Sequence, residues 1–162
     1  MILDTGCGHF PHGDVNIDLF IDETEHRIKD KKNKAYEKLN IKNIPNFIHA
    51  SSEYLPFKDN SFEEVFASNV IEHIQNPFLM FKEMHRVTKN IIYIVCPCRF
   101  KGQENIMHIH NFDKTWFIEA SKKLKMNIDF IRYSDFKYFP HYLLPIARIP
   151  VGLEVQLSKK RG

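Results

Sequence analysis

The turn after the first expected strand contains the residues best suited to contact a ligand. From Leu3 to Gly8 the sequence reads Leu-Asp-Thr-Gly-Cys-Gly. Glycines at the carboxyl end of a strand let the backbone approach a ligand closely and adopt φ values that other residues resist. Asp18, at the end of the second expected strand, is placed to accept hydrogen bonds from the ribose hydroxyls of a nucleoside cofactor. The alternatives are a tight turn without a ligand and a carboxylate that only caps a strand end.

Two histidines follow the fifth expected strand and are candidates for a general base. His108 and His110 carry imidazoles, which titrate near neutrality and can take a proton from a hydroxyl or amine nucleophile. The competing interpretation is that one of them packs against the helix that begins near Asp113. Cys96 and Cys98 precede them, but Cys-x-Cys is not the usual spacing of zinc ligands, so no metal site is expected.

Short β-rich runs alternate with helical stretches, which predicts an α/β fold with parallel strands and crossover connections. The expected strands are 2–4, 14–19, 46–50, 64–68, 91–95, 127–133 and 153–157. The expected helices are 23–39, 77–88 with Asn76 as its N-cap, and one that ends near Leu124 and is capped by Asn111 or Asp113. No helix is expected between the first two strands, because the segment 8–18 is short and contains a proline and a glycine.

Four segments in a fixed order carry a more specific pattern. After the glycine turn come Leu-Pro-Phe-Lys-Asp-Asn-Ser-Phe at 55–62, Asn-Val-Ile-Glu-His-Ile at 69–74 and Met-His-Arg-Val-Thr-Lys at 84–89. Together they resemble the class I S-adenosylmethionine-dependent methyltransferases of the type 11 group, over about residues 1–98. The resemblance implies a single domain over 1–162, built as a Rossmann-like three-layer sandwich. Its sheet would be mostly parallel and of the seven-stranded type, complete or reduced, with one antiparallel strand and a short first crossover.

The resemblance also implies an activity and a set of cofactor-binding residues. The activity is transfer of a methyl group from S-adenosylmethionine to an unidentified acceptor, with S-adenosylhomocysteine as the product. The implied binding residues are Asp4, Gly6, Cys7 and Gly8 at the methionine end, Asp18 at the ribose, Ser51, Ser52 and Glu53 at the adenine edge, and Ser68, Asn69 and Val70 beneath the methionine moiety. The alternative function is a non-catalytic or partner-dependent protein that keeps this fold for binding or regulation.

The sequence departs from the family pattern in three places. His9 replaces the third glycine, Ser51 stands where an acidic residue is common, and Met1 opens the first strand directly. We therefore expect an exposed cofactor site with weak binding, unless a second subunit, as in a homodimer, or another partner supplies a lid. The aromatic segment 136–150 is expected to form part of the acceptor wall; the alternatives are that it only covers the sheet or that it makes a dimer contact.

The composition excludes several classes of protein. Of the 162 residues, 43% are hydrophobic, 27% are charged and only three are cysteines, which favours one globular domain in a reduced, cytoplasmic compartment. The amino terminus has no signal-peptide pattern, and no apolar run reaches the roughly 18 residues of a membrane span. The net charge of +3 is mild, and the basic cluster at 29–34 is typical of a solvated helix face, so nucleic acid is not expected as a partner.

Overall fold

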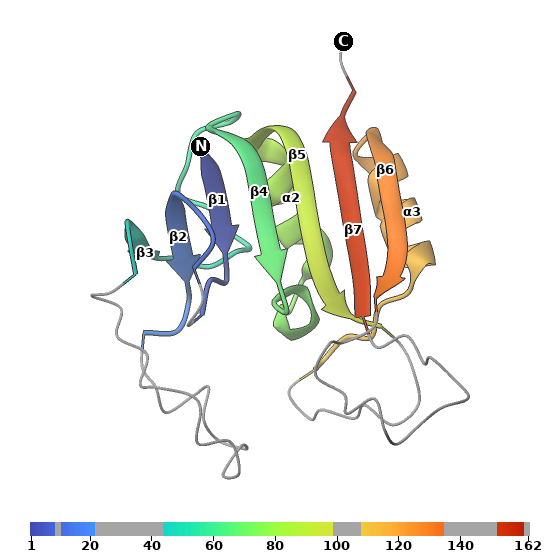
Figure 1. Cartoon of the computed structure of the whole chain (residues 1–162), viewed down its shortest axis with the longest axis horizontal. Helices are drawn as coiled ribbons and strands as arrows, with labels where there is room; N and C mark the ends of the chain where they lie inside the picture. The colour runs from blue at the N-terminus through green and yellow to red at the C-terminus, as the bar shows by residue number, and fades with distance from the viewer. Residues whose placement is uncertain (9–10, 22–43, 99–107, 135–151, 161–162) are drawn as a thin grey trace.

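The part of the chain that the structure describes forms one seven-stranded sheet (Figure 1). The structure is a computed structural model, and it describes residues 1–8, 11–21, 44–98, 108–134 and 152–160. The strands in chain order are β1 (Ile2–Thr5), β2 (Val15–Asp18), β3 (Phe47–His49), β4 (Phe62–Ser68), β5 (Thr88–Pro97), β6 (Met126–Ser134) and β7 (Gly152–Lys159). They lie in the order β3-β2-β1-β4-β5-β7-β6.

The directions of the strands agree with a Rossmann-like sheet. β1 pairs in parallel with β2 and β4, and the parallel pairing continues outward to β3 on one side and β5 on the other. β7 runs antiparallel to both of its neighbours, β5 and β6. The prediction of a mostly parallel sheet with an antiparallel strand near the end of the chain is therefore confirmed. The strand order reverses between β1 and β4, and the crevice beyond the carboxyl ends of these strands is where α/β folds bind ligands.

Two helices of the described residues cover one face of the sheet. Figure 1 shows α2 (Pro77–Val87) and α3 (Lys114–Lys123) behind the strands. The rings of Phe81 in α2 and Trp116 in α3 meet edge to face with centroids 5.9 Å apart, which places both helices in the same layer. A short 3-10 helix, η2 (Ile71–His73), follows β4. The helix predicted at 23–39, and with it the basic cluster at 29–34, lies outside the described residues, as does the aromatic segment at 136–150.

Capping side chains explain where α2 and α3 begin. The Asn76 carboxamide accepts a hydrogen bond of 3.0 Å from the backbone N–H of Leu79, and Pro77 occupies the first helical position, as predicted. Asp113, one of the two predicted caps of α3, accepts from the N–H of Trp116. The prediction that α2 includes Thr88 is wrong by one residue. Thr88 has an extended backbone and begins β5 directly, and its hydroxyl donates to main-chain carbonyl groups.

The core lies between the sheet and this helical layer. Leu3, Val65 and Ile92 are fully buried in adjacent strands. From the helical side they are joined by further fully buried side chains, among them Phe81, Met84 and Phe117. This continuous apolar layer fixes the register of β1, β4 and β5, because a slip of one residue would turn these side chains away from the helices. The same register aligns the carboxyl ends of the strands, where the candidate site lies.

The first crossover is short, as predicted. Residues 6–8 and 11–14, the described part of the connection between β1 and β2, contain no helix. A polar contact closes this connection: the Asn16 side chain accepts from the Gly13 N–H and donates to the Gly13 carbonyl oxygen. Within the described residues, no helix combines the length and the apolar character needed to cross a membrane.

Candidate active site

The glycine turn is held against the end of β2 by backbone and side-chain hydrogen bonds. The N–H groups of Gly6 and Cys7 both donate to the carbonyl oxygen of Ile17, at 2.8 and 3.0 Å. The N–H of Gly8 donates to Oδ2 of Asp18 at 2.9 Å. Asp18 therefore organises the turn itself, a role that the sequence did not reveal. The predicted glycine motif and the predicted ribose carboxylate are brought into direct contact.

The two glycines of the turn have different neighbours. Gly6 has φ +74°, and a Cβ atom there would lie 2.3 Å from Cγ2 of Val70, so packing excludes a larger residue. Gly8 has φ +50°, but a Cβ atom there would meet nothing within 4 Å among the described residues. Gly6 is thus required by the fold. Gly8 borders a space that a bound molecule can fill.

Two buried carboxylates give the surroundings of the glycine turn a negative electrostatic character. Asp4 is 1% exposed and Asp18 is 6% exposed. Burial raises the pKa of the Asp4 carboxyl to about 6, and the negative charge of Asp18 adds to the shift. Oδ2 of Asp4 accepts from the His12 N–H, and Oδ1 of Asp18 accepts from the Phe20 N–H. Two acidic groups in a low-dielectric setting favour a cationic ligand.

The residues predicted at the adenine edge lie beyond β3, beside the end of β2. The N–H of Ala50 donates to the carbonyl oxygen of Asp18, which brings the segment 51–53 to this edge. Ser52 is buried, and the Thr5 hydroxyl donates to its Oγ at 2.5 Å. Glu53 accepts from the Asn76 N–H at 2.8 Å, so its carboxylate joins this segment to the start of α2. Ser51 accepts from the N–H of Glu53 across a tight turn.

The segment predicted beneath the methionine moiety follows β4. Ser68 ends the strand, and Asn69 has a left-handed backbone with φ +53°. The N–H of Asn69 donates to the carbonyl oxygen of Val95, which ties the turn to β5. Val70 then packs over Gly6. The structure thus brings the ends of β1, β2, β3 and β4 together, with every predicted cofactor-binding residue along one edge of the sheet.

Arg86 explains why two of the sequence motifs occur together. Its guanidinium donates to the carbonyl oxygens of Leu55 and Phe57 and to the carboxylate of Asp59. It also makes a two-point hydrogen bond to the Glu83 carboxylate, at 2.7 and 2.8 Å. Both hydrogen bonds to Glu83 and the one to Asp59 raise the pKa of Arg86. Arg86 therefore joins the Leu-Pro-Phe segment to α2. We call this set of contacts from Arg86 to the loop at 55–59 and to Glu83 the Arg86 clamp; it is far from the glycine turn in sequence.

The two candidate bases have different surroundings. Nε2 of His108 lies 4.0 Å from Oε1 of Glu72, and its ring meets that of His73 at 4.9 Å between centroids. Burial lowers the pKa of His108, and the nearby His73 lowers it further. His110 instead lies with Nε2 3.4 Å from the carbonyl oxygen of Gln75. The assignment of either histidine as a general base stays a prediction.

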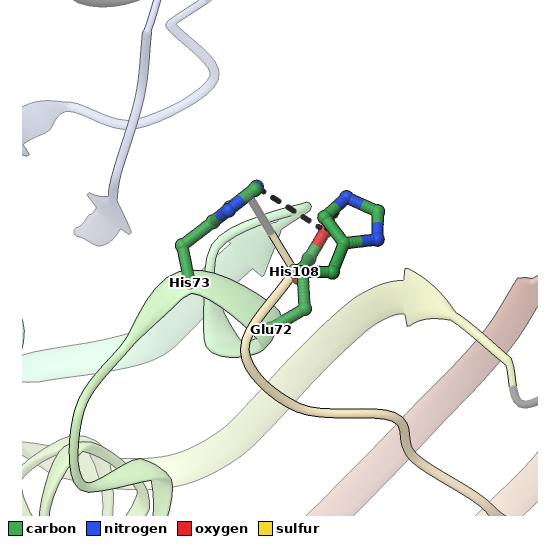
Figure 2. Close-up of side chains that lie close together, drawn as sticks. All are labelled: Glu72, His73 and His108. Carbon is green, nitrogen blue, oxygen red and sulfur yellow. Dashed lines mark ion pairs between the residues drawn. The ribbon is translucent and has the colours of Figure 1, made fainter. Parts of the chain in front are cut away.

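Glu72 and His73 are the functional candidates that the sequence interpretation passed over. Glu72 is 1% exposed, and neither of its carboxylate oxygens has a hydrogen-bond partner among the described residues. Figure 2 shows this carboxylate between the rings of His73 and His108. The signal that could have indicated it is an adjacent Glu-His pair after one buried strand and a further histidine after the next.

A comparison with known protein families identifies the family of this chain. Residues 3–96, more than half of the chain, match the family described as "Methyltransferase domain". The chain belongs to this methyltransferase domain family. The match begins in β1 and ends in β5, so it spans the glycine turn, Asp18, the end of β4 and the Arg86 clamp.

The chain is also similar in sequence to individual methyltransferases. It is 31% identical over 109 residues to an uncharacterized methyltransferase of Schizosaccharomyces pombe, and this match covers 59% of the chain and 38% of the relative. The chain spans little more than a third of the length of the curated relatives it matches. Part of each of these relatives therefore has no counterpart in this match.

Solved structures share the fold at low sequence identity. A magnesium protoporphyrin IX methyltransferase from Synechocystis, solved with bound S-adenosylmethionine, superposes with a TM-score of 0.63 at 12% identity, over 99% of this chain and 70% of that one. A protein solved in complex with the Haloferax volcanii Trm112 methyltransferase activator gives a TM-score of 0.70 at 12% identity, covering 99% and 82%. At this identity the likeness establishes the fold.

Proposed function

We propose that this methyltransferase domain binds S-adenosylmethionine at the carboxyl edge of the sheet and transfers its methyl group to an acceptor, leaving S-adenosylhomocysteine. One observation carries the proposal: Gly8 borders a space that no described residue fills, while its N–H is held by the buried carboxylate of Asp18. A side chain at Gly8 would fill the space that a cofactor needs. Family membership and the strand order support the same location.

The residues at this edge suit the chemistry of the cofactor. Each oxygen of Asp18 accepts one backbone N–H and keeps a lone pair for a ribose hydroxyl. The acidic pair of Asp4 and Asp18 suits the positively charged methionine end. Val70 offers an apolar surface above the glycine turn. These residues would hold and orient the cofactor without taking part in bond making.

The contribution to catalysis expected of the protein is to align the methyl donor with the acceptor. When bound, S-adenosylmethionine supplies an activated methyl group on a sulfonium sulfur. The chain's own contribution is to hold the donor with its methyl group facing the acceptor side and to keep both partners in line. β4 and β5 end on this side, beside η2 and residues 108–110. The acceptor would therefore enter over these segments.

The proposal is tested by calorimetric titration with S-adenosylmethionine and S-adenosylhomocysteine. We expect saturable binding of both by the wild type and a loss of at least tenfold in Gly8→Ala and in Asp18→Asn. Asp113→Asn is the matched control, because it changes a carboxylate on α3 for another good N-cap and leaves the site untouched. No binding by the wild type at millimolar ligand would overturn the proposal.

We also propose that a second subunit or a partner protein completes the site, in the cytoplasm. Leu19, Phe20 and Ile21 follow Asp18 directly and expose apolar surface beside the site, which favours a covering partner. A structural neighbour is solved with a methyltransferase activator, which supports the same idea. No disulfide joins the described cysteines, Cys7, Cys96 and Cys98, which supports a reduced compartment. The affinity for S-adenosylhomocysteine should rise with protein concentration if a homodimer forms, and a constant affinity would oppose this.

A further inference from the structure

A buried carboxylate lies next to the proposed cofactor site without a hydrogen bond from the described part of the chain. This is Glu72 in η2, which is 1% exposed and whose Oε1 and Oε2 both lack a partner there. Removing an ionised carboxylate from water is costly unless something compensates its charge. A buried carboxylate that lacks hydrogen bonds is therefore a candidate ligand for a cation.

Two imidazoles face the same carboxylate oxygen. Nε2 of His73 lies 3.8 Å from Oε1 of Glu72, and Nε2 of His108 lies 4.0 Å from it (Figure 2). One ligand atom from each of the three residues falls within 4.8 Å of the others. These separations are too long for hydrogen bonds. They are close to the roughly 3.3 Å between two ligands of a tetrahedral ion with bonds of about 2.0 Å, so small side-chain rotations would close the shell.

The backbone brings these residues together from segments far apart in the chain. The N–H groups of Ile109 and His110 both donate to the carbonyl oxygen of Glu72, at 3.0 and 3.2 Å. His73 is the neighbour of Glu72 in η2, so one short helix supplies two of the three side chains. The contact with residues 109 and 110 then fixes His108 beside them. The arrangement is therefore built by the fold and does not depend on a single flexible side chain.

The basic side chains paired with the Glu72 carboxylate among the described residues are the imidazoles of His73 and His108. No lysine or arginine among the described residues forms an ion pair with Glu72. The buried thiol of Cys96 is not among the donor atoms that lie within 4.8 Å of one another. Those donor atoms belong to one carboxylate and two imidazoles.

We propose that Glu72, His73 and His108 bind a divalent transition-metal ion. Two imidazole nitrogens and one carboxylate oxygen suit Zn²⁺ and its first-row neighbours rather than Mg²⁺ or Ca²⁺, which prefer all-oxygen sites. This replaces the sequence-based expectation of no metal site. It also gives His108 the role of a ligand, which leaves His110 as the remaining candidate for a general base.

The proposed site has the ligand count of a catalytic metal centre. Three protein ligands leave at least one coordination position for water or for an oxygen or nitrogen atom of a second molecule. Glu72 follows Val70 closely, and the His73 N–H donates to the Val70 carbonyl oxygen, so the cluster adjoins the predicted methionine end of the cofactor site. A ligand atom at the open position would therefore lie on the acceptor side. That last step rests on the proposed function, whereas metal binding itself does not.

Metal binding is measured directly on the whole chain after treatment with a chelator. Zn²⁺ titration by calorimetry at about pH 8, where imidazoles are neutral, should give one saturable site per chain. Co²⁺ is the spectroscopic probe: visible d–d bands without a sulfur-to-cobalt charge-transfer band are expected from nitrogen and oxygen ligands. A strong charge-transfer band would assign the metal to Cys7, Cys96 or Cys98 and would overturn the proposal.

Variants assign the site to the three residues. His73→Ala, His108→Ala and Glu72→Gln should each weaken Zn²⁺ binding at least tenfold. His85→Ala on α2 is the matched control and should bind as the wild type does, since His85 lies outside the cluster. Without metal, Glu72→Gln should be no less stable than the wild type, because it removes a buried carboxylate that accepts no hydrogen bond from the described residues. A purely structural Glu72 would instead lower stability in this variant and leave Zn²⁺ affinity unchanged.

The two proposals fail separately. Zn²⁺ binding with no binding of S-adenosylhomocysteine would leave the metal site standing and remove the proposed cofactor. Cofactor binding with no saturable Zn²⁺ or Co²⁺ site, or with a site insensitive to all three variants, would overturn the metal proposal and leave the methyltransferase function intact.

Discussion

Gly6 and Val70 are packed so closely that a Cβ atom on Gly6 would lie 2.3 Å from Cγ2 of Val70. The backbone of Gly6 is also left-handed, with φ +74°. We expect Gly6→Ala to lower the free energy of unfolding by about 3 kcal/mol, from backbone strain and overpacking together. Urea unfolding followed by circular dichroism measures the change. In the double variant Gly6→Ala/Val70→Ala the loss should be smaller than the sum of the two single losses, and strict additivity would contradict the contact.

Gly8→Ala should weaken cofactor binding strongly while lowering the stability of the fold only a little. The added methyl group meets no atom of the described residues, so only the left-handed backbone, with φ +50°, opposes it. We expect a loss of about 1 kcal/mol in stability. Binding of S-adenosylhomocysteine should fall at least tenfold, because the methyl group would occupy the open side of the turn. A variant that binds normally would show that the cofactor lies elsewhere.

The Arg86 clamp should be a major contribution to stability rather than to binding. Arg86→Ala removes the hydrogen bonds to Leu55, Phe57 and Asp59 and leaves Glu83, which is 15% exposed, without its main partner. We expect the free energy of unfolding to fall by about 2–3 kcal/mol, and Arg86→Lys to recover little because an ammonium cannot make the two-point contact.

An exposed ion pair provides the control for the Arg86 experiment. Lys122 and Glu119 form an exposed pair one turn apart on α3, at 2.7 Å. Lys122→Ala should cost no more than about 0.5 kcal/mol in urea unfolding. Equal losses for Lys122→Ala and Arg86→Ala would mean that the clamp does not support the loop at 55–59.

The fold was predictable because its signals are local. The Asn-Pro pair at 76 and 77 predicts the start of α2 through capping and fixed φ, and the apolar run at 91–95 predicts a buried strand. The boundaries were less accurate. Thr88 joins β5 because its hydroxyl finds main-chain acceptors in an extended conformation, a tertiary detail that helical periodicity does not contain.

The site was only partly predictable, because its contacts are not local. The glycine turn and Asp18 could be proposed from their places after two strands. That Asp18 holds the Gly8 N–H depends on the pairing of β1 with β2. The cluster of Glu72, His73 and His108 depends on two hydrogen bonds from residues 109 and 110 to Glu72. The Glu-His pair after β4 and the histidine after β5 mark the candidates, but no spacing in the sequence specifies the contact between them.

The titration of Asp4 should appear in the pH dependence of stability. The ordinary carboxyl pKa of 3.8 applies to the unfolded chain, and burial raises the pKa of Asp4 to about 6 in the folded protein. As the pH rises from 3.8 to 6, the unfolded chain loses this proton first, so the contribution of Asp4 to stability falls. It is fully present below pH 3.8 and is lost above about pH 6. The Asp4→Asn variant lacks this loss.

The difference in unfolding free energy between Asp4→Asn and the wild type should therefore grow in favour of the variant between about pH 4 and pH 6 and then level off. A shift of about two pKa units corresponds to about 3 kcal/mol, which is the upper limit of the growth. The measurement is urea unfolding of both proteins across about pH 4 to 8. The carboxamide introduced by Asp4→Asn would keep an oxygen for the His12 N–H, so the slope with pH isolates the charge from the lost contact. A flat difference for Asp4→Asn would mean that water or a neighbouring group compensates the carboxylate, and the attraction proposed for a cationic cofactor would be weakened with it.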